Sequence, residues 1–253
     1  PNRSSATVIE LPDGQTILYD AGTSLPSDAG RNVVGPFLNH RDIRHIDRLY
    51  ISHPNLDHFS GIPTVLDQIE ADAVIINPYF ESKSSPRSPS RHLLALLSAR
   101  GQSLQVLDTL TTTWEFGGVI FELLWPRGDC DPQLSSNETS TVLRLNYAGR
   151  SILLTVDIEE RTQRALLERG DLHADILLLP HHGSFRASTV DFIRAVAPLA
   201  AIRSSNERTQ QTLSGLDAAI GDVPLYNTAD VGAVEVVLDR EGVHMATPCR
   251  VTK

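Results

Sequence analysis

Three apolar segments of the sequence each end directly in residues of the kinds that bind metals, and this pattern limits the folds open to the chain. Short apolar runs bounded by polar turns favour buried strands. In α/β proteins, functional residues gather beyond the carboxyl ends of such strands. We therefore expect an α/β fold in which three turns supply one site. The segments and the residues that follow them are Arg48–Ser52 before His53–His58, Ile152–Val156 before Asp157, and Ile176–Leu179 before Pro180–Ser184.

The length and composition of the chain allow one domain. Its 253 residues are 41% hydrophobic, so a large core can form undivided and we expect residues 1–253 to be a single domain. No run approaches the roughly 18 apolar residues of a membrane-spanning helix, and the start lacks the features of a signal peptide. The chain begins with Pro1 and soon enters the strand-like run Ala6–Glu10, so we expect the natural polypeptide to extend upstream.

The charge balance restricts how the protein can meet a polyanion. The formal net charge is −9 with neutral histidines, which opposes an extended positive surface that follows phosphate backbones. Bound cations would have to supply the local positive charge for such a substrate. Cys130 and Cys249 lie outside any Cys-x-x-Cys pair. This argues against a zinc ribbon and leaves a disulfide and the redox compartment open.

Strand-like and helix-like segments are interspersed along the chain without an internal repeat. Pro12-Asp13-Gly14 is turn chemistry between two strand-like runs and predicts a β-hairpin, and Tyr147–Arg150 predicts another. This order favours two packed sheets covered by helices. The predicted strands are Ala6–Glu10, Thr16–Asp20, Arg48–Ser52, Ala73–Asn77, Val119–Leu124, Thr141–Asn146, Ser151–Thr155, Ala174–Leu179, Leu199–Arg203, Val223–Tyr226 and Ala233–Leu238.

Three helices can be placed from their end signals. Leucines at helical spacing predict a helix over Arg91–Arg100 that Gly101 ends. A second helix is expected to open at Asp157 and to close near Gly170, and a third to span Ser188–Val196 with Ser188 as its N-cap.

Charged surface segments have plain interpretations. Glu81–Ser90 is rich in Ser, Pro and charge, which predicts a mobile surface loop that does not pack. Glu159-Glu160-Arg161 predicts a solvated helix face. The short basic run of Lys83, Arg87 and Arg91 is either solvated or in contact with DNA.

The first turn has the composition of a metal site, because His53, Asn55, Asp57 and His58 fall within six residues and imidazole and carboxylate are common metal ligands. Each cluster also has a simpler explanation. The His-rich turn can be solvated and idle, Asp157 can cap a helix, and His181 can be a satisfied core histidine. Three separate strands ending in ligand-type residues make coincidence a poor explanation. We therefore expect His53, Asp57, His58, Asp157 and His181 to converge.

The motifs resemble those of the metallo-β-lactamase superfamily, and most closely its ComEC branch from DNA-uptake proteins. His53–His58 resembles the signature His-x-(His/Asp)-x-Asp-His, and Pro180–Ser184 matches the ComEC form. Further similar segments are Asp20-Ala21-Gly22, Asn137–Ser140, Thr155-Val156-Asp157 and Tyr226–Ala233. The resemblance covers nearly the whole chain. It implies a four-layer αββα sandwich, one or two divalent metal ions, Mn or Zn, and hydrolysis of phosphodiester bonds in a DNA substrate.

The resemblance also implies roles for individual residues. It puts His53 and Asn55 on a first metal ion, Asp57, His58 and His181 on a second, and Asp157 between them. Asp57, Asp157 and His182 are the implied catalytic residues, although His182 can instead orient a ligand. Asn137 and Ser184 are the implied substrate-binding residues. The sequence itself leaves localisation open, and a ComEC-like protein would carry this domain outside the cytoplasm as part of a bacterial membrane protein.

Three positions depart from the family pattern. Asn55 replaces an acid or His, so it offers a neutral carbonyl oxygen, which is a weaker ligand for a divalent ion. Val156 stands where Gly is usual, and because Val does not readily adopt positive φ we expect the Asp157 turn to be re-aimed. Thr209-Gln210-Gln211 stands where many ComEC domains have Gly-His-Pro. The first metal site is therefore the weaker half.

Three functions remain open from the sequence. The first is a metal-dependent nuclease or phosphodiesterase that serves competence. The second is a hydrolase of another bond, such as a thioester or lactone, because this fold hosts many substrates. The third is a degenerate domain that has lost the first metal and keeps a binding or structural role.

Overall fold

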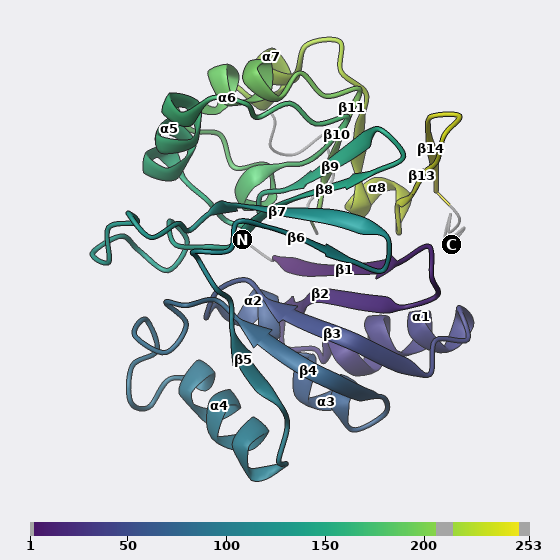
Figure 1. Ribbon diagram of the computed structural model, residues 1–253, viewed down its shortest axis with the longest axis vertical. Coiled ribbons are helices and arrows are strands. Elements are labelled where there is room, and N and C mark those ends of the chain that lie inside the picture. Colours follow the sequence, from purple (N-terminus) through teal and green to yellow (C-terminus); the bar gives the residue numbers. More distant parts are fainter. Residues whose placement is uncertain (1–2, 206–214, 248–253) are drawn as a thin grey trace. The chain divides into compact units, whose positions relative to one another are not determined.

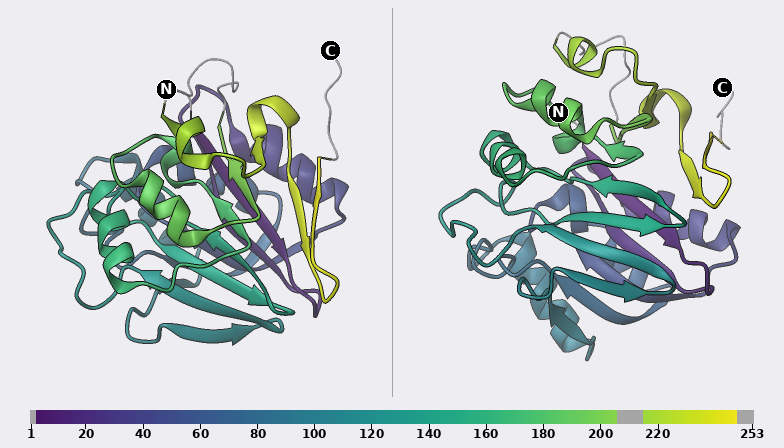
Figure 2. Two further views of the ribbon diagram at one scale, coloured as in Figure 1. Left: turned by 90° about the horizontal axis from the view of Figure 1, so that it is seen from above. Right: turned by 45° about the horizontal axis from the view of Figure 1, so that its top comes forward.

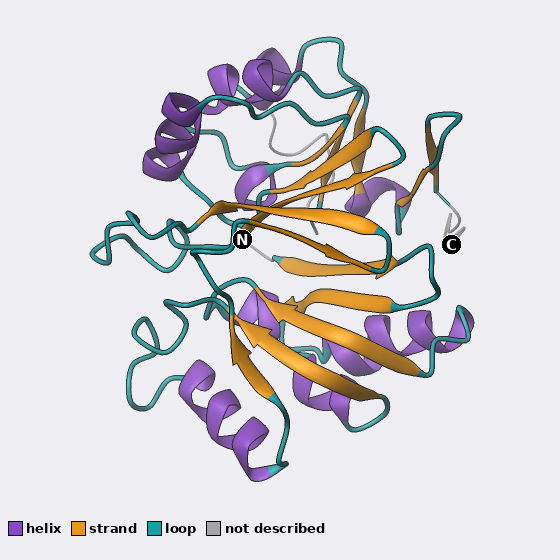
Figure 3. Cartoon of the chain, in the orientation of Figure 1, coloured by secondary structure: helices purple, strands orange, loops and turns teal. Residues whose placement is uncertain are grey.

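A computed structural model describes residues 3–205 and 215–247. These residues group into two compact units. Unit 1 comprises the described residues up to Leu110 together with Asp131–Ser136, and unit 2 comprises Thr111–Cys130 and the described residues from Asn137 onward. Each unit is an α/β structure with its own sheet (Figures 1 and 3).

The sheet of unit 1 has five strands in the order in which the chain makes them. The first two pair as the predicted hairpin, and the remaining strands add in parallel. Short helices connect the parallel strands, as a parallel sheet requires. The strands are β1 (Ser4–Glu10), β2 (Thr16–Thr23), β3 (His45–Ile51), β4 (Glu70–Ile76) and β5 (Leu104–Val106), and the helices are η1 (Gly30–Val34), α1 (Gly35–His40), α2 (Leu56–Phe59), α3 (Ile62–Leu66) and α4 (Pro89–Ala99).

The core of unit 1 lies between one face of this sheet and its helices. Leu18, Leu49 and Val74 from three neighbouring strands pack with Leu38 of α1 and Leu97 of α4, and all five side chains are fully buried. Figure 1 shows α1, α3 and α4 along the same side of the sheet. Burial of this apolar face fixes strand register, so the polar residues after β3 are held at a defined edge.

The sheet of unit 2 has seven strands and changes from antiparallel to parallel at β9. Its order is β12-β11-β10-β9-β8-β7-β6. The strands are β6 (Thr113–Phe116), β7 (Val119–Trp125), β8 (Val142–Tyr147), β9 (Arg150–Leu154), β10 (Ile176–Leu178), β11 (Ala200–Arg203) and β12 (Leu225–Asn227), and the helices are α5 (Glu160–Arg169), η2 (Pro180–Gly183), α6 (Thr189–Val196), α7 (Leu216–Ile220) and α8 (Thr228–Val231).

A separate two-stranded ribbon, β13 (Glu235–Leu238) and β14 (Val243–Ala246), covers part of the sheet of unit 2. Its residues pack against Ile176 and Ile202 of the parallel strands. Figure 2 shows this yellow ribbon on one side of the sheet and the green helices on the other. The parallel strands are therefore covered on both faces, which explains why their sequences read as continuous apolar runs.

One predicted helix start and one predicted side-chain cap are wrong. The second helix begins at Glu160 and not at Asp157, because the Glu138 carboxylate accepts hydrogen bonds from the backbone N–H groups of Glu159, Arg161 and Thr162. Ser188 does precede α6, but its hydroxyl donates to Gln163 Oε1 at 2.8 Å and does not cap the helix. The C-terminal glycine signal at Gly170 is confirmed, with φ of 70°.

The segment Glu81–Ser90 packs more than predicted. It forms turns in which Ser84 and Ser90 are 4% and 2% exposed, and the Ser84 hydroxyl donates to the Phe80 carbonyl at 2.6 Å. Lys83 donates to the Pro132 carbonyl and Arg91 pairs with Glu81. Short polar side chains that bond to nearby backbone let such a segment pack without an apolar core.

Two further predictions concern the whole chain. No helix within residues 3–205 and 215–247 is long and apolar enough to cross a membrane. Cys130 is buried, whereas Cys249 and the Thr209-Gln210-Gln211 departure lie outside the described residues.

Candidate metal centre

The turn after β3 places three ligand-type side chains together in unit 1. His53, Asp57 and His58 are 0%, 8% and 1% exposed, and the two imidazole rings lie with their centroids 4.1 Å apart. Asp57 and His58 also offer ligand atoms within 4.8 Å of one another. Burial of two histidines and a carboxylate in one turn excludes a solvated turn.

A buried carboxylate fixes the orientation of both histidines. Asp20 is fully buried, and it accepts hydrogen bonds from the Ser52 N–H at 2.8 Å, the Ser52 hydroxyl at 2.7 Å and His58 Nδ1 at 2.7 Å. Because the Ser52 hydroxyl gives its proton to Asp20, it must accept from His53 Nδ1, which lies 3.0 Å away. Both rings therefore carry their proton on Nδ1, and Nε2 is the nitrogen that can bind a metal.

Gly22 shows why the Asp-x-Gly segment needs its glycine. A Cβ atom at Gly22 would lie 2.5 Å from the Leu56 carbonyl oxygen and 2.6 Å from the carbonyl carbon of Asp57. The absence of a side chain lets β2 approach the backbone of the ligand turn. That approach brings Asp20 within reach of Ser52 and His58.

Asn55 stands at the N-cap of α2, in extended conformation. Its side-chain oxygen accepts a hydrogen bond from the Ser136 hydroxyl at 3.0 Å. A carbonyl oxygen has two lone pairs, so this contact and metal binding are compatible. The ligand role of Asn55 stays a prediction.

In unit 2, two neighbouring parallel strands bring together the acid and the histidines that follow them. Asp157 follows β9, and His181 and His182 follow β10, which is paired with β9 in register. All three side chains are at most 8% exposed. Asp157 Oδ1 lies 3.4 Å from His182 Nε2, and Asp157 Oδ2 lies 3.8 Å from His181 Nε2.

The two histidines of unit 2 are held in the same way as those of unit 1. His182 Nδ1 donates to the Ser204 carbonyl at 2.8 Å, and His181 Nδ1 donates to Glu159 Oε1 at 2.8 Å. Both acceptors can only accept, so Nε2 of each ring is the potential ligand nitrogen. The sequence assigned metal binding to His181 and catalysis to His182, and these contacts suit either ring for metal binding.

The remaining predicted residues lie around His181. The amide nitrogen of Asn137 is 3.5 Å from His181 Nε2 and 3.5 Å from Glu159 Oε1. The Ser184 N–H donates to the His181 carbonyl at 2.9 Å and closes the turn. Both residues are therefore within unit 2 and beside the histidines, while their contact with a substrate stays a prediction.

Sequence reasoning missed several residues that support this turn. The prediction of a solvated face at Glu159 is wrong, because its carboxylate binds His181 and Arg186. Arg203 is 5% exposed and donates from Nε to the His182 carbonyl at 3.0 Å. Glu138 anchors the segment after Asp157. The signal available in the sequence was that Glu159 follows Asp157, at a strand end, by two residues. The first turn of many helices is also acidic, so this signal is not distinctive.

The backbone around these ligands adopts an uncommon conformation. Val156, His181 and His182 have φ values of 52°, 48° and 56°, in the left-handed region that non-glycine residues rarely occupy. The expectation that Val156 avoids positive φ is wrong. Its carbonyl accepts the His181 N–H at 2.7 Å, so the strained conformation connects the two ligand turns of unit 2.

Buried Tyr19 does not act as a base next to Asp20. Burial, with a further contribution from the charge of Asp20, raises the pKa of Tyr19 well above its usual value. The phenol is neutral at physiological pH.

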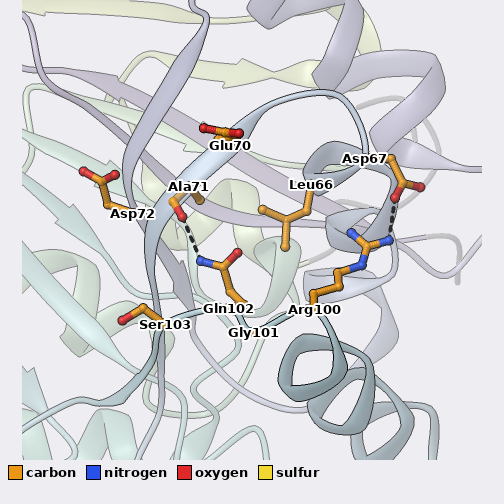
Figure 4. A pocket seen from close by; sticks show the side chains of 9 residues that line it. All are labelled: Leu66, Asp67, Glu70, Ala71, Asp72, Arg100, Gly101, Gln102 and Ser103. Atoms are coloured by element: carbon orange, nitrogen blue, oxygen red, sulfur yellow. Dashed lines mark hydrogen bonds and ion pairs between the residues drawn. The ribbon is translucent and has the colours of Figure 1, made fainter.

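A hollow in unit 1 lies away from the ligand turn. It is lined by residues that include Glu70, Asp72, Arg100 and Gln102 (Figure 4), at the amino end of β4, whereas His53 follows the carboxyl end of the neighbouring parallel strand. Arg100 pairs with Asp67 there, and Gln102 donates to the Ala71 carbonyl. None of the predicted site residues lines this hollow.

The ligand sets of both units suit a divalent cation. Each set combines carboxylate oxygen with imidazole nitrogen, the donors that Zn²⁺ and Mn²⁺ accept. In each set, groups that hydrogen-bond to Nδ1 orient the rings, which is the usual arrangement behind metal-binding histidines. The chemistry of the donors does not identify the metal.

Comparisons with known proteins point to one superfamily. A family model described as "Metallo-beta-lactamase superfamily" matches residues 1–205. Competence protein ComA of Neisseria gonorrhoeae is 27% identical over 258 residues, which cover 96% of this chain and 33% of that protein. ComE operon protein 3 of Bacillus subtilis is 26% identical over 187 residues, which cover 73% of this chain and 23% of that protein. The chain spans about a quarter to a third of these curated relatives.

Solved structures agree on the fold. Igni18, a metallo hydrolase from the archaeon Ignicoccus hospitalis, is similar with a TM-score of 0.50 at 10% identity over 97% of each chain. The CmlA β-hydroxylase is similar with a TM-score of 0.51 at 14% identity, over 89% of this chain and 51% of that one. At such identities the likeness shows the fold alone.

The Asp20 network leads to a first testable prediction. In Asp20→Asn, the amide cannot accept all three hydrogen bonds, and its NH₂ group favours the His58 tautomer with the proton on Nε2. We expect Zn²⁺ or Mn²⁺ affinity measured by calorimetry to fall by about 10–100-fold. Long-range ¹H–¹⁵N spectra should show the changed tautomer. Asp13→Asn, in an exposed turn, is the control, and unchanged metal affinity of Asp20→Asn would contradict the assignment.

The conformation of Val156 leads to a second prediction. A β-branched residue in the left-handed region costs on the order of 1–3 kcal/mol, whereas glycine costs roughly 0.5–1 kcal/mol in flexibility. Val156→Gly should therefore raise the free energy of unfolding by about 1 kcal/mol and the melting temperature by about 2–4 °C. Ala148→Gly, at another positive φ, should gain less because Ala is unbranched. A melting temperature lowered by Val156→Gly would show that the turn is not strained.

Proposed function

Because the chain belongs to the metallo-β-lactamase superfamily, we propose that it is a phosphodiesterase that cleaves DNA. The family and the buried His/Asp ligands make it a metal-dependent hydrolase of the metallo-β-lactamase type. The observation that carries the proposal is that four histidines each hydrogen-bond through Nδ1 to another group, which leaves Nε2 as the potential ligand atom. These histidines are His53, His58, His181 and His182. One relative is named a competence protein, and the resemblance of the motifs to the ComEC branch of DNA-uptake proteins supports DNA as the substrate.

The ligands of the proposed centre come from the turns already described. The resemblance assigns them to one centre, and this assignment is part of the proposal. Bound divalent ions would supply a water of lowered pKa and positive charge for the entering and leaving oxygens. The residues that would hold the ions are His53, Asn55, Asp57, His58, Asp157 and one or both of His181 and His182.

The protein side chains have separate tasks in such a reaction. Asp20, Glu159 and the Ser204 carbonyl keep the ligand nitrogens oriented, so that little reorganisation is needed when substrate binds. A ring of the His181-His182 pair that does not bind metal can donate a proton to the leaving oxygen. Asn137 and Ser184 can donate hydrogen bonds to phosphate oxygens.

One experiment separates this function from its alternatives. Elemental analysis of the purified protein would be combined with cleavage assays on single-stranded and double-stranded DNA, a thioester and a lactone, each with Mn²⁺, Mg²⁺ or Zn²⁺. We expect one or two ions per chain and metal-dependent cleavage of DNA. Cleavage of only the thioester or lactone would support another hydrolase, and a protein that binds no metal would support a degenerate domain.

Asn55 offers a test of the first metal. Asn55→Asp keeps the acceptor for the Ser136 hydroxyl and replaces a neutral oxygen ligand with an anionic one. We expect Mn²⁺ affinity measured by calorimetry to rise by roughly tenfold, and DNA cleavage to increase with it. Asn32→Asp adds the same charge at an exposed position of unit 1 and should change neither. An equal Mn²⁺ affinity of Asn55→Asp and the parent protein would place Asn55 outside the ligand shell.

Asp157 offers a test of the proposed centre as a whole. Because Glu138, and not Asp157, caps α5, Asp157→Ala should keep a cooperative melting transition. It removes the carboxylate proposed to bridge the metals, so DNA cleavage should fall to background. Asp157→Asn preserves the side-chain volume and should also lose DNA cleavage. Glu168→Ala, on the exposed side of α5, should still cleave DNA. A metal-loaded Asp157→Ala protein that cleaves DNA at the parent rate would place the chemistry elsewhere.

A further inference from the structure

The turn that carries the histidines of unit 2 continues into an exposed aromatic residue. Phe185 follows Ser184 directly and is 42% exposed. In the described part of the chain, it is the one aromatic residue among the exposed large apolar side chains; the others are Val, Leu and Ile. An aromatic ring left in solvent three residues from a candidate ligand is unusual for a residue type that normally packs in a core.

The ring of Phe185 packs against the backbone of Gly215. A Cβ atom at Gly215 would lie 3.1 Å from ring atoms of Phe185, so the ring rests against the backbone at the start of α7. Gly215 thus lets the ring pack closely on one side while the rest of it stays accessible. A ring held in this way loses little conformational freedom when a flat group stacks on it.

Arg186 follows Phe185 in the chain, and its guanidinium lies against the Phe185 main-chain carbonyl and next to His181. Its Nη2 donates to Glu159 Oε1 at 2.9 Å and lies 3.4 Å from His181 Nδ1, and its Nη1 donates to the Phe185 carbonyl at 3.1 Å. The side chain is 34% exposed. A guanidinium carries five N–H donors, and these contacts use two of them, so the others can bind an anionic oxygen.

The pairing of Arg186 with Glu159 fixes where this guanidinium lies. Glu159 also accepts from His181 Nδ1, so one carboxylate sets both the histidine and the guanidinium. An oriented guanidinium binds phosphate through parallel hydrogen bonds better than a mobile cation does. In a chain with a net charge of −9, such oriented N–H donors beside the histidines favour an anionic substrate over a neutral ester.

We propose that Phe185 and Arg186 form a nucleotide-binding subsite, in which Arg186 binds a phosphate oxygen and Phe185 stacks on the neighbouring base. The subsite rests on the proposed phosphodiesterase function and makes its substrate class specific, because aromatic stacking with an arginine contact is how proteins bind single-stranded nucleic acid without sequence preference. Glu159 is a positioning residue for both His181 and Arg186.

Two substrates with the same leaving group test the subsite in the metal-loaded protein. Thymidine 5′-(p-nitrophenyl phosphate) carries a base, and methyl p-nitrophenyl phosphate does not. We expect Phe185→Ala to lower kcat/KM about tenfold for the thymidine substrate and to leave the methyl substrate unchanged. Arg186→Ala should raise KM for both, with Arg186→Lys intermediate.

Matched controls remove the same chemistry elsewhere in unit 2. Leu199→Ala removes an apolar side chain that is 58% exposed, and Arg194→Ala removes an exposed guanidinium on α6. Neither variant should change kcat/KM or KM for either substrate. Phe185→Leu keeps apolar bulk without an aromatic ring, so it should resemble Phe185→Ala in kinetics even if Phe185→Ala is poorly folded. Equal loss on both substrates for the Phe185 variants would overturn the stacking role.

Equilibrium binding separates failure of the subsite from failure of the proposed function. Binding of thymidine 5′-monophosphate is measured by calorimetry for the parent, Phe185→Leu and Arg186→Ala proteins. A parent protein that cleaves neither ester would refute the phosphodiesterase proposal, while weaker nucleotide binding by both variants would still support the subsite. Equal binding by all three proteins would overturn the subsite, whatever the activity of the parent.

Discussion

The hydrogen bonds of Asp20 are the interaction on which the ligand turn of unit 1 depends. A fully buried carboxylate is costly unless donors surround it, and here the Ser52 N–H, the Ser52 hydroxyl and His58 Nδ1 all donate to it. The same bonds settle which nitrogen of His58 and of His53 carries a proton. A single charge thus determines the chemistry of two rings, and the backbone of Gly22 allows the approach that makes this possible.

In unit 2, different groups orient the rings of the two histidines. A main-chain carbonyl holds His182 and the carboxylate of Glu159 holds His181, while both histidines adopt positive φ. Such conformations persist only where surrounding contacts stabilise them, and here the Val156 carbonyl and the buried Arg203 supply those contacts. Backbone strain and hydrogen bonding together direct the Nε2 atoms toward Asp157.

The net charge of the chain is negative, so an anionic substrate would be attracted by groups at the site and not by the surface as a whole. A net charge of −9 repels a polyanion at long range, so bound cations and oriented donors must provide the attraction. Buried histidines and carboxylates suit divalent ions, and the Glu159–Arg186 pair holds guanidinium N–H donors in a fixed place beside His181. Fold likeness alone does not choose a substrate, and the proposal of a phosphodiester substrate rests on these ligand sets and oriented donors.

The sequence by itself determined the superfamily, the order of the main strands, and the residues at the ends of β3, β9 and β10, because apolar runs and ligand spacing are local signals. It did not predict the short strands β5, β6 and β14 or the helical segment Gly30–His40, where local periodicity is weak. Only the tertiary structure decided that Asp20, Glu138, Glu159 and Arg186 support the site, that Val156 accepts a left-handed conformation, and which histidine nitrogens carry protons. These depend on contacts between residues distant in sequence, such as Asp20 with Ser52 and Asn137 with His181, which no short-range pattern encodes.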